Sequence, residues 1–425
     1  MSAAEVIVVG GGPAGMMAAG RAAECGASVV LLEKGPRLGR KLRISGKGRA
    51  NITNTADIDE FVEAFSPNGK FLYGAFSRFF RDDLVALLLG MGVQTKVERG
   101  GRVFPASDCA GDVADAIERW LVSAGARVRF NARVRSVIIE SGRAAGVELY
   151  GGRMAARAVV VATGGASYPK TGSTGDGYAM AREAGHRVVA PRPALSALVC
   201  AEEWVADLQG CSLRNVEATL LADLPGMDHP KKIASEFGEM LFTHFGVSGP
   251  IILTLSRGVG ELAKHGRVII SIDLKPALSA EQLHARLVRD FAQTKHLKNY
   301  LTALLPRQVI DVFIYLAGID PDKPVNTITA AERARMVELA KDFRVTVTGM
   351  AGLEEAIVTS GGIPIGEIDS RTMGSKLVEG LFFAGEVIDV DATTGGFNLQ
   401  AAFSTGYVAG EAAAGSRRTL HSHGE

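Results

Sequence analysis

Three glycines near the N-terminus have the spacing of a pyrophosphate-binding turn. Gly10, Gly12 and Gly15 form a G-x-G-x-x-G pattern directly after an apolar run, residues 5–9 (EVIVV). Glycine at these positions lets the chain turn tightly, lets the backbone approach a phosphate and lets the next helix pack on the strand. The free N–H groups at the start of that helix then face the phosphates. The residues expected to contact a dinucleotide here are Gly10, Gly12, Pro13, Ala14 and Gly15.

An acidic residue stands where the ribose of a dinucleotide would be bound. Glu33 ends the second apolar run, residues 27–33 (ASVVLLE), eighteen positions after Gly15. At about this distance, ~20 residues, a carboxylate accepts hydrogen bonds from the adenosine ribose hydroxyls; an exposed acid at a strand end is the alternative. A carboxylate would repel a 2′-phosphate, so NADP is not expected in this site. The run, the glycines and a helix over residues 14–25 form one βαβ unit, and Lys34 follows directly after it.

Two later turns have the form of flavoprotein motifs. Thr163 and Gly164 end the apolar run 157–162 (RAVVVA), and this turn resembles the A-T-G turn of two-dinucleotide-binding-domain flavoproteins. Gly385 and Glu386 end the run LFFA and resemble the late G-D or G-E motif, whose acid contacts the ribityl chain. The order of the early, middle and late motifs implies FAD rather than NAD.

Longer segments resemble one family. Residues 42–54 (LRISGKGRANITN), 101–107 (GRVFPAS), 241–257 (LFTHFGVSGPIILTLSR) and 385–406 together are similar to the BaiN/YhiN family of bacterial FAD-dependent oxidoreductases. The resemblance covers nearly the whole chain and implies an FAD domain made of both ends of the sequence, with a substrate domain inserted between them. The family often has a cysteine where this chain has Ala50, so a thiol role is absent there.

A second, more distant resemblance concerns residues 171–185 (TGSTGDGYAMAREAG), which are similar to a helix start of the succinate dehydrogenase and fumarate reductase flavoproteins. That resemblance favours redox chemistry at carbon–carbon bonds.

The segment 42–54 is expected to be a loop that wraps the pyrophosphate and the flavin edge. Arg49 supplies a fixed cation suited to a phosphate, although solvated loop charge is the alternative for it and for Lys41. The family resemblance implies roles for Asn51 and Thr53. The further residues expected to contact the cofactor are Lys41, Ser45, Gly46, Arg49, Asn51, Thr53 and Val134.

The last helix is expected to begin beside the flavin. Gly396 precedes Asn398 and Leu399 at its N-terminus, where free N–H groups can stabilise negative charge on the N1 and C2 carbonyl side of a reduced flavin. All three are expected cofactor contacts. Asp389 and Asp391 either cap this segment or take part in catalysis.

The catalytic proton donor is not identified by any strong pattern. Reduction of a C=C bond by a flavin requires a hydride from N5 and a proton donor at the other carbon. Tyr168, His244 and Arg102 are weak candidates, because each also fits a structural role as a packed tyrosine, a satisfied histidine or a loop arginine. No metal site is expected, because the four cysteines include no C-x-x-C pair. Cys25 and Cys109 are expected to be buried small apolar residues.

Charge and hydropathy exclude several kinds of partner. Lys plus Arg number 47 and Asp plus Glu number 46 in 425 residues, so no long-range field favours nucleic acid or an anionic membrane. No stretch approaches 18 apolar residues, so no membrane span is expected. Export is not expected either, and a reducing cytoplasm is the expected location. No nucleic-acid partner is expected, and the sequence indicates no particular oligomeric state.

The predicted fold class is α/β, with a Rossmann-type FAD-binding domain and an inserted β-rich plus helical substrate domain. The FAD-binding domain is expected over residues 1–190 and 351–425. The insertion is expected over residues 191–350, with antiparallel strands over 191–275 and helices over 279–342, because prolines and turns replace buried parallel strands there.

The predicted function is an FAD-dependent oxidoreductase that uses NAD(P)H to reduce an unsaturated small molecule, such as an enone, held between the FAD domain and the insertion. No second G-x-G-x-x-G follows a strand, so the nicotinamide is expected to bind transiently. The alternatives are an oxidase or dehydrogenase, a redox sensor without turnover, and a flavoprotein that acts on RNA. For the last, the basic surface would comprise Lys231, Lys232, Lys295 and Lys298.

Overall fold

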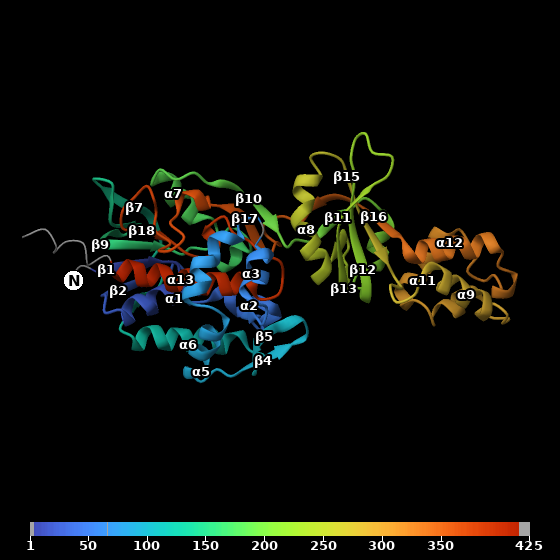
Figure 1. Cartoon of the computed structure of the whole chain (residues 1–425), viewed down its shortest axis with the longest axis horizontal. Coiled ribbons are helices and arrows are strands. Elements are labelled where there is room, and N and C mark those ends of the chain that lie inside the picture. The colour runs from blue at the N-terminus through green and yellow to red at the C-terminus, as the bar shows by residue number, and fades with distance from the viewer. Residues whose placement is uncertain (1–3, 66, 416–425) are drawn as a thin grey trace, which may run out of the picture. The chain divides into compact units, whose positions relative to one another are not determined.

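The structure is a computed structural model that describes residues 4–65 and 67–415. It divides into two compact units, the first made of Met1–Pro193 with Ala356–Glu425 and the second of Ala194–Glu355. The two ends of the chain therefore share unit 1, where the blue and red segments lie together (Figure 1). The α/β class with a Rossmann-type domain is confirmed.

Unit 1 is built on a seven-stranded sheet in the order β6-β2-β1-β9-β8-β7, with β18 also paired to β9. Strands β1, β2, β6, β9 and β18 are parallel, and the register places Val9 beside both Leu32 and Val161. Strands β1 and β2 are buried almost throughout, which explains their continuous apolar sequence. The strands are β1 (Ala4–Val9), β2 (Val29–Leu32), β6 (Arg127–Arg129), β7 (Val134–Glu140), β8 (Arg143–Leu149), β9 (Gly152–Val161) and β18 (Leu381–Phe383).

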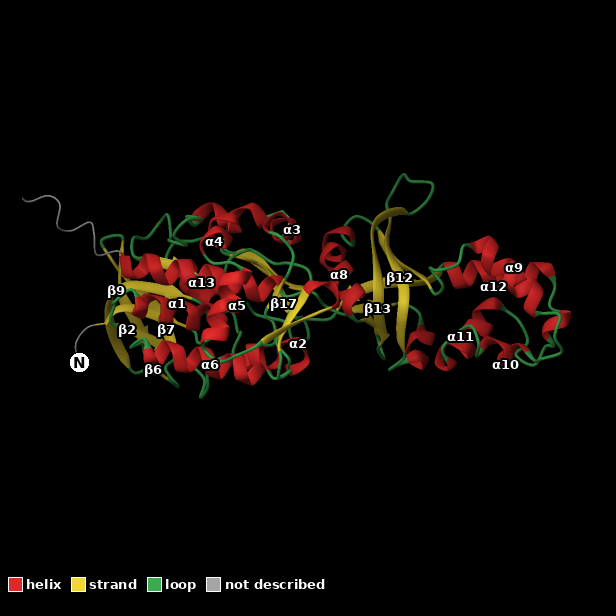
Figure 2. Ribbon diagram, turned by 60° about the horizontal axis from the view of Figure 1, so that its bottom comes forward, coloured by secondary structure: helices red, strands yellow, loops and turns green. Residues whose placement is uncertain are grey.

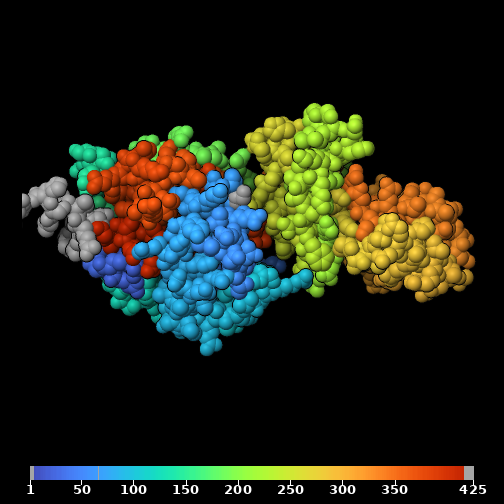
Figure 3. Space-filling model, in the orientation of Figure 1, coloured from blue at the N-terminus to red at the C-terminus, as the bar shows by residue number. Residues whose placement is uncertain are grey.

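The first and last helices of unit 1 pack directly on each other. Helix α1 (Pro13–Glu24) and helix α13 (Phe397–Gly415) run side by side along the sheet (Figure 2). A Cβ added at Gly406 or Gly410 would come within 2.3 Å of a backbone oxygen of α1. Both glycines are therefore required by the close approach of the two backbones. On the surface, N-terminal and C-terminal segments also meet along one face (Figure 3).

The rest of unit 1 differs from the predicted elements in two places. Residues 42–54 are a loop only in part, because helix α2 (Arg40–Gly48) covers their start before it is broken at Ser45–Lys47, and residues 50–52, which have no regular structure, lead into strand β3. Residues 71–91, whose apolar pattern predicts one helix, are interrupted at Phe79 and Phe80, where the backbone is extended and Phe80 packs against Phe61. The remaining elements are β3 (Thr53–Asn54), α3 (Ile58–Ala64), η1 (Gly69–Leu72), α4 (Tyr73–Arg78), α5 (Arg81–Gly90), β4 (Thr95–Glu98), η2 (Arg99–Gly101), β5 (Arg102–Pro105), α6 (Ala110–Ser123), η3 (Pro169–Thr171), α7 (Asp176–Glu183), β10 (Val189–Ala194), β17 (Val358–Gly362), η6 (Ile365–Glu367) and η7 (Gly385–Val387).

Unit 2 contains a closed six-stranded barrel in the order β11-β14-β13-β12-β15-β16. Its sequence predicts a β-rich segment over residues 191–275, and within it Pro250 starts helix α8, which packs on β13. Gly249, with φ +96°, precedes that proline and allows the sharp turn into the helix. The elements are β11 (Leu198–Cys200), η4 (Glu203–Leu208), β12 (Ser212–Asp223), β13 (Lys231–Phe242), β14 (Gly246–Ser248), α8 (Pro250–Leu262), β15 (Arg267–Asp273), α9 (Ala280–Asp290), α10 (Leu297–Leu301), α11 (Arg307–Ala317), η5 (Val325–Thr327), α12 (Ala330–Lys341) and β16 (Phe343–Met350).

The prediction that Cys25 and Cys109 are buried is wrong, because both are exposed. Cys25 ends helix α1 and Cys109 precedes helix α6, so each lies at a helix terminus and not on a core-facing turn. Among the described helices, none is long and apolar enough to cross a lipid bilayer.

A buried histidine fastens helix α7 to the segment before β18. His186 Nδ1 lies 2.9 Å from a carboxylate oxygen of Glu367, and Nε2 lies 2.8 Å from Ser375 Oγ. The same Ser375 oxygen accepts backbone N–H groups of Leu377 and Val378, so both of its lone pairs are engaged and it does not act as a nucleophile. Burial lowers the pKa of His186 despite the nearby carboxylate, which keeps the ring neutral.

This cluster predicts a loss of stability in acid. The unfolded histidine binds a proton below about pH 6.5, whereas the folded one resists it, so the free energy of unfolding falls as pH drops. The lowered pKa of Glu367 acts in the same direction. His186→Gln should reduce stability at pH 7.5 by on the order of 1 kcal/mol and should narrow that difference at pH 5. Urea unfolding of both proteins at several pH values measures this difference in stability. A difference that stays the same at every pH would contradict the prediction.

The packing of α13 on α1 gives a second prediction. Gly410→Ala should destabilise the protein by about 1–3 kcal/mol, because the new methyl group must push the two helices apart. Gly90→Ala is the matched control, since a Cβ there meets nothing within 4 Å and alanine favours the helix. Thermal unfolding measures the stability of both variants. Equal unfolding temperatures for the two would refute the packing argument.

Candidate functional site

A large cavity opens at the carboxyl ends of four parallel strands of unit 1. Strands β1, β2, β9 and β18 all end on its wall, which is where open α/β sheets bind nucleotides. The cavity encloses about 1410 Å³ of empty space, including the part open to solvent. Its position at the carboxyl ends of the strands suits a dinucleotide.

The three glycines of the first turn have three different reasons to be glycine. Gly10 has φ +104°, and an added Cβ would lie 2.6 Å from Ala162 O. A Cβ on Gly15 would overlap the carbonyl oxygen of Gly10 at 1.8 Å, so Gly15 allows α1 to pack on the strand end. A Cβ on Gly12 would meet nothing within 4 Å, because this residue faces the open cavity.

Glu33 is held at the end of β2 by backbone donors. One carboxylate oxygen accepts the N–H of Gly11 at 2.8 Å and the other accepts the N–H of Gly35 at 2.6 Å. Both the side chain and the glycine turn therefore keep one fixed arrangement at the cavity wall.

A second acid lies near this end of the cavity. Lys34 Nζ lies 2.7 Å from Asp176 and 2.6 Å from the hydroxyl of Thr174. Burial would raise the pKa of Asp176, but the ammonium of Lys34 and the Thr174 hydroxyl hold it below its ordinary value. Asp176 is therefore a fixed negative charge and not a proton donor.

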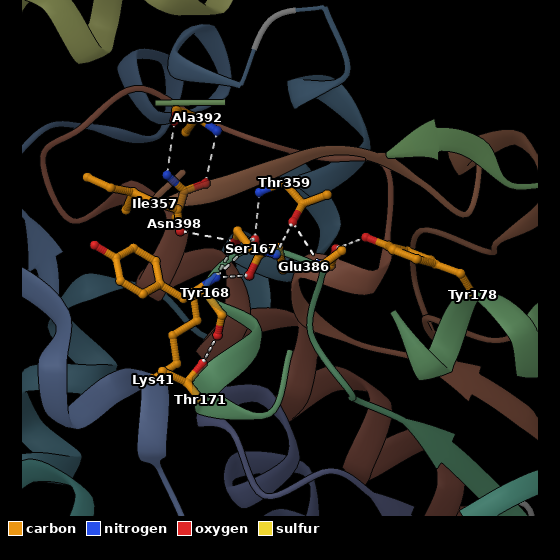
Figure 4. A network of polar contacts seen from close by, with 11 residues as sticks. Lys41, Ser167, Tyr168, Thr171, Tyr178, Ile357, Thr359, Glu386, Ala392 and Asn398 are labelled. Carbon is orange, nitrogen blue, oxygen red and sulfur yellow. Dashed lines mark hydrogen bonds and ion pairs between the residues drawn. The ribbon is translucent and has the colours of Figure 1, made fainter. Parts of the chain in front are cut away.

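The late motif forms a polar network with helix α2. Lys41 Nζ contacts a Glu386 oxygen at 2.9 Å and Ser167 Oγ at 2.7 Å (Figure 4). The other Glu386 oxygen accepts the Thr359 N–H at 2.7 Å and the Ser167 hydroxyl at 3.1 Å. Burial alone would raise the pKa of Glu386, yet Lys41 and these donors lower it. The network thus holds an ionised carboxylate in the cavity wall.

The start of α13 is fastened to the chain on both sides. Asn398 exchanges hydrogen bonds of 2.9 and 3.0 Å with the backbone of Ala392 (Figure 4). Gly396 has φ +104°, and an added Cβ would lie 2.2 Å from Thr53 O. Asn398 and Leu399 line the cavity, so the positive end of the helix dipole faces it.

Most of the predicted cofactor residues come together around this cavity. Those in its wall are Gly10, Gly12, Pro13, Ala14, Glu33, Lys34, Lys41, Ser45, Val134, Thr163, Gly164, Gly385, Glu386, Asn398 and Leu399. Those outside its wall are Gly15, Gly46, Arg49, Asn51, Thr53 and Gly396.

Arg49 is the main correction to the predicted site. Its guanidinium makes ion pairs with Glu98 and Asp108, the latter at 2.8 Å, and lies 4.2 Å above the Phe104 ring. The cation is therefore satisfied by protein carboxylates and does not face the cavity as a phosphate ligand. It instead braces the sheet formed by β3, β5 and β4.

The proton-donor candidates lie in three different parts of the chain. Arg102 contacts the Arg99 carbonyl at 3.0 Å and belongs to the β5 strand. His244 lies in unit 2 with its ring 4.9 Å from that of Phe245. Tyr168 precedes η3 and directly follows Ser167 of the Glu386 network.

Ser167, Thr359 and Asp176 were missed by the sequence reasoning. Asp176 lies inside the quoted segment 171–185, so its motif was visible but its ion pair was not. Thr359 is brought to Glu386 only by the position of β17, and nothing in its local sequence indicates this.

Unpaired polar atoms also fit a long polar ligand. Thr163 Oγ1, Asn51 Oδ1 and Thr53 Oγ1 are buried and have no partner within the described structure. Thr163 lines the cavity, and a buried hydroxyl without a partner is costly unless a ligand completes it. Together with the open face of Gly12, this fits a dinucleotide.

Comparison with known proteins gives matches over nearly the whole chain. The family model described as "HI0933-like protein Rossmann domain" matches residues 4–412. The "3-dehydro-bile acid delta(4,6)-reductase" of Clostridium scindens is 29% identical over 412 residues, covering 96% of this chain and 98% of the relative. The "Ribosomal RNA dihydrouridine synthase" of Escherichia coli is 30% identical over 414 residues, covering 95% and 96%.

A solved structure supports the fold. The 3-ketosteroid-delta4-(5alpha)-dehydrogenase of Rhodococcus jostii RHA1 superposes with a TM-score of 0.53 at 16% identity, covering 97% of this chain and 96% of that one.

The cavity gives a prediction about Gly12. Gly12→Val should still fold, because a Cβ there meets nothing within 4 Å, but its side chain should fill the space that a pyrophosphate would take. The purified variant is expected to lack the yellow colour and bound FAD of the wild type. Gly151→Val is the control, since it too meets nothing within 4 Å but lies outside the cavity. A yellow, stoichiometric Gly12→Val protein would contradict the site.

Proposed function

The chain belongs to the HI0933-like family of Rossmann-domain proteins, and from this premise we propose that it reduces a C=C bond conjugated to a carbonyl group, using FAD. It is a flavin-dependent oxidoreductase. The observation that carries the proposal is the cavity at the carboxyl ends of β1, β2, β9 and β18, with Gly12 open to it and Glu33 fixed beside it. The names of the two relatives both denote saturation of such a bond.

Different residues of the cavity would hold different parts of the cofactor. The N-terminus of α1 and the Gly12 backbone would hold the pyrophosphate, and Glu33 would bind the adenosine ribose. Glu386 and Lys41 would hold the ribityl region, while the start of α13 would stabilise negative charge on the flavin ring. When bound, FAD supplies the hydride chemistry that the side chains lack.

The reductant is proposed to be NADH or NADPH. The sequence has no second G-x-G-x-x-G after a strand, so the nicotinamide would visit the flavin without a Rossmann domain of its own. An oxidase or dehydrogenase direction remains the alternative, and it differs in which compound reduces the flavin.

Two substrate classes follow from the same chemistry. The first is a small enone, as the name of the bile-acid relative suggests. The second is a uracil base in ribosomal RNA, whose C5=C6 bond is also conjugated to a carbonyl. The relative from Escherichia coli favours it, because it is 30% identical over 95% of this chain. With this second substrate, RNA would be a partner of the protein, contrary to the expectation from its net charge.

The proposal predicts a spectral result. Under anaerobic conditions NADH or NADPH should bleach the flavin absorbance, and an α,β-unsaturated ketone or uridine-containing ribosomal RNA should restore it. Mass spectrometry should then find the ketone or the base heavier by two hydrogens. The Gly12→Val protein, which is expected to lack FAD, is the control for substrate reduction that does not depend on the cofactor. The proposed reaction would be refuted if nicotinamides did not reduce the flavin and if the chemically reduced protein passed electrons to neither substrate.

A further inference from the structure

Tyr168 has a backbone conformation that few bulky residues adopt. Its φ is +52° and its ψ is +58°, in the left-handed region. The Thr171 N–H and hydroxyl both donate to the Tyr168 carbonyl, at 2.8 and 2.7 Å, so the surroundings enforce this conformation. Strain of this kind, of order 1–3 kcal/mol, persists where it positions a functional group.

The preceding residue ties Tyr168 to the Glu386 network. Ser167 is fully buried, its N–H donates to Thr359 Oγ1 at 3.0 Å, and its hydroxyl contacts both Lys41 and Glu386. The chain lines the cavity before Tyr168 at Gly164 and after it at Thr171. The backbone of Tyr168 is thus fixed between two parts of the cavity wall.

The ring of Tyr168 remains accessible. The residue is 37% exposed, and Figure 4 shows the ring projecting away from Glu386 on the side of Lys41. Its hydroxyl makes no hydrogen bond with any residue that the structure describes. A phenol held by its backbone but not by its hydroxyl is free to donate that hydrogen to a ligand.

The acids of the cavity wall are unsuited to donate a proton. Glu386 and Asp176 have lowered pKa values because of Lys41 and Lys34, so both are ionised. Glu33 accepts N–H groups on both carboxylate oxygens and lies at the end of the cavity formed by β2.

We propose that Tyr168 is the catalytic proton donor of the reaction. The inference rests on the proposed function. When bound, reduced FAD would supply a hydride for the β-carbon of the substrate, and the phenol of Tyr168 would give its proton to the α-carbon as the electrons of the C=C bond form the second C–H bond. The C=C bond is reduced by two electrons, and the tyrosinate recovers its proton from water at the exposed side of the ring.

Tyr168→Phe tests the assignment in the FAD-loaded, full-length protein. With 2-cyclohexenone or uridine-containing ribosomal RNA as oxidant, reoxidation of the dithionite-reduced flavin should slow by about 100-fold or more, as expected for loss of a general acid. FAD content should be unchanged, and the solvent deuterium isotope effect on reoxidation should disappear. Tyr73→Phe, at an exposed tyrosine of α4, is the matched control. Equal reoxidation rates in Tyr168→Phe and wild type would overturn the assignment.

A second measurement separates this inference from the proposed function. If wild-type protein passes electrons to no unsaturated substrate, the proposed function fails, and the position of the tyrosine is judged by nitration with tetranitromethane. Tyr168 nitration should be slower with FAD bound than in protein stripped of FAD, whereas Tyr73 nitration should be the same. Equal Tyr168 nitration in both states would place the phenol away from the cofactor and overturn the inference.

Discussion

The close contact between α13 and α1 is the constraint on which the rest of unit 1 depends. It is possible only because Gly406 and Gly410 bring backbone against backbone. Directly before Gly406, the Thr405 hydroxyl accepts the Gly385 N–H at 3.0 Å, so the position of α13 also fixes the turn after β18. That turn carries Glu386. A helix packing at the far end of the sequence thereby places a carboxylate opposite the first glycine turn.

The Glu386 network then fixes a buried ion pair in the wall of the cavity. A buried carboxylate is costly unless a cation and hydrogen-bond donors compensate it, and Lys41, Ser167 and Thr359 supply these from three separate parts of the sequence. The positive ends of the helix dipoles of α1 and α13 face the same cavity. Such fields favour phosphates at one end and a reduced flavin at the other.

The sequence predicted the parts of the site that one segment determines by itself. A strand followed by glycines and a helix forces the first turn, and Glu33 follows from the length of one βαβ unit. It failed for Arg49, because a cation in a glycine-rich segment has the same local pattern whether it binds a phosphate or Glu98 and Asp108. Thr359 could not be found either, since its role arises from a strand that joins the site only after folding.

The charges of unit 2 bear on whether the substrate is an RNA or a small molecule. Of the lysines that would form a basic RNA surface, Lys298 lies 2.6 Å from Asp311 and Lys232 lies 3.8 Å from Glu217. Paired charges of this kind create little long-range attraction for a polyanion. A uracil in RNA would therefore have to be selected by the shape of the RNA and by contacts to the base. A small enone needs no such field, because its conjugated carbonyl is recognised at the atoms that react.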